Sequence, residues 1–114
     1  MLILASKSPR RREILELLGL DFCIETADTD EFCDLSDPGD RVAALAAQKG
    51  EALIQKKMAC GQELNDTLII ACDTLVYVNG EFLGKPKNRY DAYRMLTALS
   101  GKSHEVWSGV FIYL

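Results

Sequence analysis

Unbroken apolar runs along this chain alternate with segments whose apolar residues recur every three or four positions. Short apolar runs, such as residues 2–5 and 68–72, are typical of buried strands. Asn79-Gly80 is a strong hairpin signal, because both residues tolerate the positive φ angles of a two-residue turn. The predicted strands cover residues 2–5, 22–26, 68–72, 75–78, 81–83 and 104–114.

Capping residues mark the ends of three helices. The first helix shows the signals most clearly, because Ser8 can cap it, Pro9 suits its first position and Gly19 can end it. The predicted helices run from residue 9 to 18, from Pro38 to a point before Gly61, and from the capping pair Asn88 and Asp91 to a point before Gly101.

Apolar residues at helical spacing define the face that each helix turns to the core. The predicted core faces are Ile14, Leu17 and Leu18; then Val42, Leu45, Ala46, Ala52 and Leu53; and finally Ala92, Met95, Leu96 and Leu99. Lys49 lies on the stripe of the second helix. Such a lysine either meets an anionic partner in the interior or runs its stem along the edge of the stripe into water, and spacing alone leaves both open.

This order of elements indicates an α/β fold, in which helices flank a mixed twisted sheet. The 114 residues suit one domain, and they include no repeat, low-complexity tract or obvious linker. The last apolar strand runs to Leu114, whereas most domains end in a polar tail. We interpret this end as that of an incomplete domain or as a strand that a partner completes, and we keep a homodimer open.

Charge and cysteine content exclude several functional classes. A formal net charge of -4 argues against a general nucleic-acid binder, which needs a basic surface. The four cysteines include no C-x-x-C pair and only one histidine accompanies them, which favours reduced thiols over a zinc site. No apolar stretch reaches the roughly 20 residues that span a bilayer. We therefore expect a cytoplasmic protein without a membrane partner.

Three consecutive arginines, Arg10, Arg11 and Arg12, stand where the first helix begins. Cations are unfavourable at this position, because the unpaired N–H groups and the helix dipole already make it positive. A bound phosphate would balance this charge. Since successive residues lie about 100° apart around a helix, the three cannot all reach one ligand, and one or two of them are expected to be structural or solvated.

Together with these arginines, four more charged residues form a set typical of phosphate and metal binding: Lys49, Lys85, Asp73 and Glu31. Cations bind phosphate oxygens, carboxylates bind Mg²⁺ or Mn²⁺, and one carboxylate can accept a proton from an attacking water. Each residue also has a plain alternative: an acid at a strand end can cap a turn, a lysine before proline can be solvated, and an acidic loop can be only a loop. The shared location favours function, because ligands of α/β sheets bind beyond the carboxyl ends of strands.

Six motifs follow one another along the chain: Leu4-Ala5-Ser6-Lys7-Ser8-Pro9-Arg10-Arg11, Asp28-Thr29-Asp30-Glu31, Ala46-Ala47-Gln48-Lys49, Ala71-Cys72-Asp73-Thr74, Gly84-Lys85-Pro86 and Leu99-Ser100-Gly101-Lys102-Ser103-His104. In order and spacing they resemble the motifs of the Maf proteins, a family named for septum-formation inhibition. The resemblance implies a Maf/ITPase-like fold. It also implies metal-dependent hydrolysis between the α and β phosphates of a nucleoside triphosphate.

The resemblance assigns a role to each matching residue. Asp73 is expected to be the catalytic base and Glu31 a metal-linked or water-positioning acid, so both are candidate metal ligands. The expected substrate-binding residues are Ser6, Ser8, Arg10, Arg11, Lys49, Thr74 and Lys85. Arg10 and Thr74 resemble the branch that prefers dTTP and UTP rather than 7-methyl-GTP.

Two departures from the family pattern qualify this expectation. Residues 1–114 correspond to the N-terminal part of a single Maf-like domain, without the C-terminal part that completes the cleft. A non-catalytic nucleotide-binding or cell-division regulatory protein is therefore the alternative. Gly50 stands inside a helix where the family more often has alanine, and glycine there costs up to about 1 kcal/mol.

Overall fold

The sheet is built around one long strand, β3, which spans Leu68–Val78. The computed structural model describes residues 1–114. Its elements are β1 (Leu2–Leu4), α1 (Pro9–Leu17), β2 (Cys23–Ile24), α2 (Pro38–Ala59), β3, β4 (Glu81–Leu83), α3 (Arg89–Leu99) and β5 (Glu105–Tyr113). This confirms the predicted α/β class with a mixed sheet. None of the helices combines the length and apolar character needed to cross a membrane.

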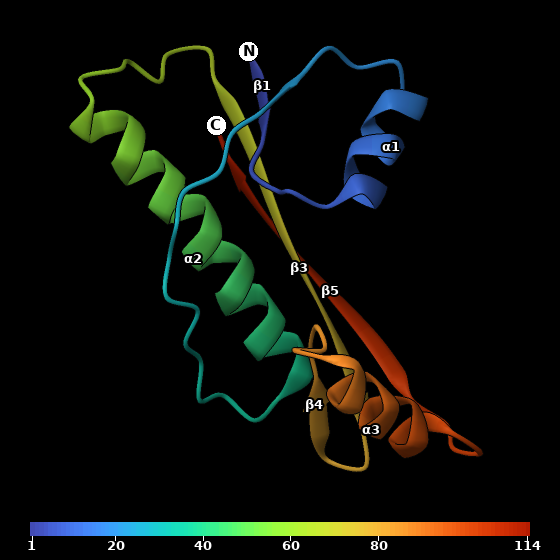
Figure 1. Ribbon diagram of the computed structural model, residues 1–114. Coiled ribbons are helices and arrows are strands. Elements are labelled where there is room, and N and C mark those ends of the chain that lie inside the picture. The colour runs from blue at the N-terminus through green and yellow to red at the C-terminus, as the bar shows by residue number, and fades with distance from the viewer.

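The two edges of β3 are used differently (Figure 1). Along one edge, β5 pairs antiparallel with residues 69–77. The other edge is shared, because β1 pairs parallel with residues 68–70 and β4 pairs antiparallel with residues 76–78. Residues 71–75 therefore have no strand partner on that edge. We call this gap between β1 and β4 the notch.

Asp73 lies in the middle of β3, not at a strand end. The expectation of two separate strands is wrong here, because β5 pairs without interruption from Ile69 to Tyr77 and continues the strand through the polar pair Asp73-Thr74. The pairing with β1 does end at Ile70, however. Asp73 therefore lies beside the notch, buried and opposite Gly109 of β5 on the other edge.

Helix α2 covers one face of the sheet (Figure 1). The predicted stripe is confirmed at Val42, Leu45, Ala46 and Leu53, which are buried, whereas Ala52 is half-buried. The core cluster consists of Ile3, Ala5, Leu53, Ile69 and Ala71. Burial of large side chains such as Leu53 stabilises the fold by about 1.5–3 kcal/mol each. The core therefore holds β1, β3 and α2 together next to the notch.

Helix α2 and strand β5 approach closely at two glycines. A Cβ atom at Gly50 would overlap the Phe111 ring, and a Cβ atom at Gly109 would lie 2.6 Å from the Val42 carbonyl oxygen. The aromatic ring thus occupies the space that an alanine side chain would need. Packing against Phe111 offsets the helix-propensity cost of Gly50, which explains its presence in the helix interior.

The predicted core face of α1 is wrong. Leu15 is the buried residue of this helix, while Ile14, Leu17 and Leu18 are exposed. The cause is a long-range contact, because Arg11 reaches across to β3. Leu15 lies four residues after Arg11 and so shares its side of the helix. The capping prediction is confirmed, since the Ser8 side chain accepts the Arg11 N–H and Gly19 has φ +70°.

The predicted core face of α3 is also wrong, since the helix contains no buried residue. Leu96 is exposed, and Ala92, Met95 and Leu99 are only half-buried. Local contacts stabilise the helix instead: the Asn88 side chain accepts the Asp91 N–H at 2.8 Å, and Arg94 pairs with both Asp91 and Glu81. The capping signal therefore predicts α3 correctly, although its apolar pattern does not locate a core.

Strand β5 turns alternate side chains toward α2 and away from it. Phe111 lies against α2, next to Gly50. On the opposite face, Val106, Val110 and Ile112 are between 58% and 61% exposed. The outer face of this strand is therefore apolar and open.

Candidate active site

The notch opens into a cavity of about 470 Å³. Loops after β1 and β4, the exposed edge of β3, the start of α1 and the middle of α2 all contribute to its wall. Every predicted site residue except Arg10 lines it: Ser6, Ser8, Arg11, Glu31, Lys49, Asp73, Thr74 and Lys85. The structure thus brings together residues up to 79 positions apart in sequence, from Ser6 to Lys85.

Lys49 connects two carboxylates at the centre of this cavity. Its Nζ lies 2.8 Å from Asp73 Oδ1 and 3.3 Å from Glu31 Oε1. The Lys49 side chain is 24% exposed, and that of Asp73 is 11% exposed. Of the two alternatives for this lysine, the structure supports the inward one with anionic partners. The ammonium reduces the repulsion between the carboxylates that it bridges.

The second carboxylate oxygen of Asp73 has no hydrogen-bond partner. Asp73 Oδ2 is buried and unpaired, although most buried polar atoms in proteins are satisfied. An oxygen left in this way can accept a proton or a cation. The chain contains no group of three or more histidine, cysteine or acidic residues suited to a metal. Asp73 and Glu31 are the two carboxylates that form ion pairs with Lys49.

Arg11 is fixed across the notch by three hydrogen bonds. Its Nη1 donates to Ser6 Oγ at 3.0 Å and to the Cys72 carbonyl oxygen at 3.2 Å, while Nη2 donates to Thr74 Oγ1 at 3.0 Å. The Cys72 carbonyl is accessible to Arg11 because no strand pairs with this edge. A guanidinium has five N–H donors, so Arg11 retains donors for an anion in the cavity.

The other two arginines lie on the surface. Arg12 Nε lies 2.9 Å from Glu16 Oε1, and Arg10 Nε lies 3.9 Å from Glu13 Oε2, with the Arg10 side chain 83% exposed. The expectation that one or two of the three are structural or solvated is confirmed. Arg10 does not line the cavity, so the structure does not place it with the other predicted substrate-binding residues.

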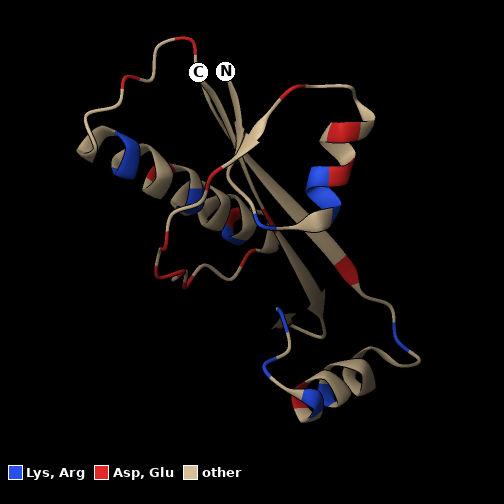
Figure 2. Cartoon of the chain, turned by 45° about the horizontal axis from the view of Figure 1, so that its top comes forward, with Lys and Arg blue, Asp and Glu red and all other residues tan.

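Two further lysines border the cavity without a partner in the chain. Lys85 is exposed in the loop after β4, and Lys7 is exposed in the loop before α1. Neither side chain forms an ion pair. Figure 2 shows basic positions at the start of α1 and acidic positions gathered in the loop before α2. Lys7 was not predicted, although its place beside Ser6 in the same loop is a signal for it.

Ser108 is a second residue that the sequence did not reveal. Its Oγ lies 3.2 Å from Thr74 Oγ1, which also accepts a hydrogen bond from Arg11. The contact depends on the pairing of β3 with β5, in which Thr74 lies opposite Ser108. No local pattern encodes that register.

Cys72 lies beside Asp73 but is poorly suited to act as a nucleophile. Burial raises the pKa of its thiol, and the nearby cations Arg11 and Lys49 only partly oppose this effect. The neutral thiol is therefore favoured at neutral pH, whereas nucleophilic attack requires the thiolate.

Comparison with known proteins shows which family the chain belongs to. The family model described as Maf-like protein matches residues 1–114. The dTTP/UTP pyrophosphatase of Latilactobacillus sakei subsp. sakei is 42% identical over 113 residues, which are 98% of this chain and 59% of that protein. A Bacillus anthracis protein of the same name is 42% identical over 112 residues, 97% of this chain and 55% of the relative.

A third relative, the dTTP/UTP pyrophosphatase of Caldicellulosiruptor saccharolyticus, is 40% identical over 111 residues, 96% of this chain and 54% of that protein. The chain thus spans a little more than half the length of these curated relatives. Since the family model matches along the whole sequence, this chain belongs to the family of Maf-like proteins.

Proposed function

We propose that the cavity is the phosphate-binding part of a nucleoside triphosphate pyrophosphatase site, acting on dTTP or UTP. The observation that carries this proposal is the buried, unpaired Oδ2 of Asp73 in a cavity that cations also line. A carboxylate oxygen that can accept a proton and cations suited to phosphate thus line one cavity, which supports the proposal. The choice of nucleotide rests on the relatives' names, dTTP/UTP pyrophosphatase.

The cations and hydroxyls of the cavity would hold the triphosphate. Lys85 and Lys7 are free to approach phosphate oxygens, and Arg11 is already oriented by Ser6. The Ser8 side chain supports the turn by capping α1. Charge-assisted hydrogen bonds to phosphate are among the stronger ones in proteins, so these contacts suit a polyanionic substrate.

Asp73 would act as the general base. In this reaction a water oxygen bonds to the α phosphorus, the bond from that phosphorus to the α–β bridging oxygen breaks, and pyrophosphate leaves with the bond's electron pair. The water's proton passes to Asp73, whose Oδ2 has no donor competing for it. The other oxygen, Oδ1, is held by Lys49, which fixes the direction of Oδ2.

The residues present fit a divalent cation of the Mg²⁺ or Mn²⁺ type. Such ions use one or two carboxylates, phosphate oxygens and several waters, and here the carboxylates are Asp73 and Glu31. When bound, the cation would neutralise the charge that develops on the phosphates. Lys49 would then remain beside the carboxylates and face the substrate.

Three more specific proposals concern base selectivity, dimerisation and location in the cell. Thr74 lines the cavity, but its hydroxyl is engaged by Arg11 and Ser108, and Arg10 lies outside the cavity. A direct contact of either residue with the base thus remains a prediction from the resemblance. A homodimer and a cytoplasmic location likewise remain predictions from the sequence.

Product analysis tests the reaction directly. UTP incubated with the chain and Mn²⁺ in ¹⁸O-labelled water should yield pyrophosphate and UMP that carries the label. Formation of UDP and phosphate would contradict cleavage at the α–β bond. Nucleotide binding without any product would instead support the non-catalytic alternative.

A further inference from the structure

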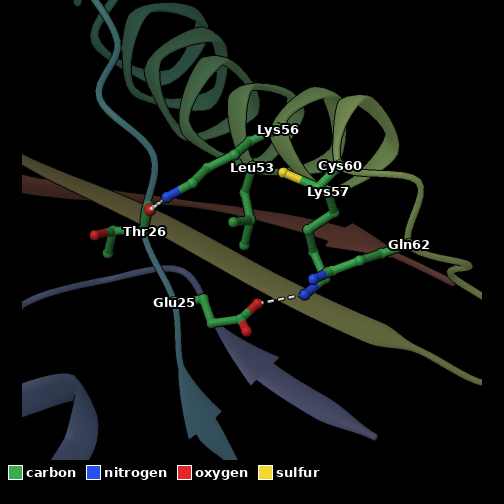
Figure 3. A pocket seen from close by; sticks show the side chains of 7 residues that line it. All are labelled: Glu25, Thr26, Leu53, Lys56, Lys57, Cys60 and Gln62. Atoms are coloured by element: carbon green, nitrogen blue, oxygen red, sulfur yellow. Dashed lines mark hydrogen bonds and ion pairs between the residues drawn. The ribbon is translucent and has the colours of Figure 1, made fainter.

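The segment that carries Glu31 runs antiparallel along α2. Residues 25–37, which we call the strap, contact α2 first through an ion pair between Glu25 and Lys57 (Figure 3). Near the other end, the Leu35 carbonyl oxygen accepts a hydrogen bond from Arg41 at 3.2 Å. As the residue numbers of the strap increase, those of its partners on α2 decrease, from Lys57 to Arg41. Figure 1 shows the strap alongside α2.

Gln48 holds the strap backbone between these two ends. Its Oε1 accepts the Phe32 N–H at 3.3 Å, and its Nε2 donates to the Phe32 carbonyl oxygen at 2.6 Å. One side-chain amide thereby binds both polar groups of one residue. The Phe32 side chain is 74% exposed and so contributes little to holding the strap.

This contact is adjacent to the predicted metal-linked acid. Glu31 directly precedes Phe32, just as Lys49 directly follows Gln48. Lys49 Nζ lies 3.3 Å from the Glu31 carboxylate, while Gln48 fixes the neighbouring peptide group. Two adjacent residues of α2 therefore hold this part of the strap: Gln48 binds its backbone and Lys49 binds the Glu31 carboxylate.

We propose that Gln48 is a positioning residue that holds Glu31 beside Lys49 and Asp73. The expected effect on catalysis rests on the proposed function, whereas the structural role of Gln48 does not. The strap backbone at Phe32 has no strand partner. Without the amide contacts, the nearest hydrogen bonds between the strap and α2 lie at Thr26 and Leu35. The Glu31 carboxylate would then be held by its half-exposed ion pair with Lys49, and such pairs are weak.

Gln48→Met tests this role, because methionine has similar length but neither hydrogen-bonding group. Gln55→Met is the matched control, since Gln55 lies two turns along the same helix, is exposed and makes no side-chain hydrogen bond. Supporting groups of this kind typically contribute about 10–100-fold to activity. We expect kcat for UTP to fall by that factor in Gln48→Met, with KM nearly unchanged, and both to stay at native values in the control.

A double-substitution cycle separates positioning from a general loss of structure. If Gln48 acts through Glu31, adding Gln48→Met to Glu31→Gln should lower kcat no further. A loss of kcat in the double variant equal to the sum of the losses in the two single variants would overturn the proposal. Equal kcat in Gln48→Met and Gln55→Met would overturn it as well.

Amide hydrogen exchange at Phe32, followed by NMR, keeps the structural claim separate from the proposed function. We expect faster exchange at Phe32 and a changed carboxyl ¹³C shift of Glu31 in Gln48→Met, and neither in Gln55→Met. Should the native chain hydrolyse no nucleotide, the proposed function fails and this measurement alone decides the role of Gln48. Unchanged exchange and an unchanged Glu31 shift would contradict it.

Discussion

Lys49 Nζ lies 2.8 Å from Asp73 Oδ1, and both side chains are largely shielded from water. Helix α2 and strand β3 supply the two groups, so their contact depends on the packing of α2 across the sheet. The pair orients the carboxylate and leaves Oδ2 without a partner. Asp73 is therefore held in place without losing the oxygen that the proposed chemistry uses.

Loss of the lysine should destabilise the fold by leaving Asp73 unpaired. Removing one partner of a fully buried pair costs about 3–5 kcal/mol, and the partial exposure of Lys49 reduces this to roughly 1–3 kcal/mol. We expect that loss in the free energy of unfolding for Lys49→Met, measured by urea denaturation. Restoration of stability in the Lys49→Met, Asp73→Asn double variant is the matching control, and equal stability of native and Lys49→Met chains would contradict the assignment.

Alanine at Gly50 should destabilise the chain despite its higher helix propensity. Overlap with the Phe111 ring is expected to cost about 1–3 kcal/mol, more than the propensity gain of up to about 1 kcal/mol. Thermal denaturation of Gly50→Ala measures the net effect. In a Phe111→Val background the same substitution should become stabilising, and a destabilisation of equal size in both backgrounds would refute the ring contact as its cause.

The adjacent arginines should differ in their effect on nucleotide binding. Arg11→Ala removes a guanidinium from the cavity, and contacts to charged groups contribute about 1.5–3 kcal/mol, which corresponds to roughly 10–100-fold in affinity. Arg12→Ala removes only a surface pair with Glu16. Calorimetric titration with UTP should therefore separate the two variants. Equal affinities would mean that Arg11 does not contact the nucleotide.

Local signals predict the elements of this fold better than their packing. Ser8, Asn88 and the Asn79-Gly80 turn act through contacts within a few residues, and the structure places caps and a hairpin there. The periodic stripe of α2 is correct because that helix crosses the sheet. On α1, by contrast, the contact of Arg11 with β3 decides which side faces inward.

The sequence predicts those site residues that lie in or next to recognisable helices and strands. Helical spacing places Lys49 on the core stripe of α2 but leaves its inward direction open, and the cavity contains all but one of the expected residues. Ser108 and Gln48 could not be predicted in this way. Their partners, Thr74 and Phe32, are defined by strand register and by the course of an irregular strap.

The rate of pyrophosphate release by the native chain and by Asp73→Asn tests the central claim most directly. With UTP and Mg²⁺ or Mn²⁺, the native chain should release pyrophosphate and UMP in equal amounts. Loss of a general base lowers the rate by about 10²–10⁴-fold, so Asp73→Asn should bind UTP but release pyrophosphate at least that much more slowly. Equal rates in the two proteins, or no release by the native chain although UTP binds, would contradict Asp73 as the base of a pyrophosphatase site.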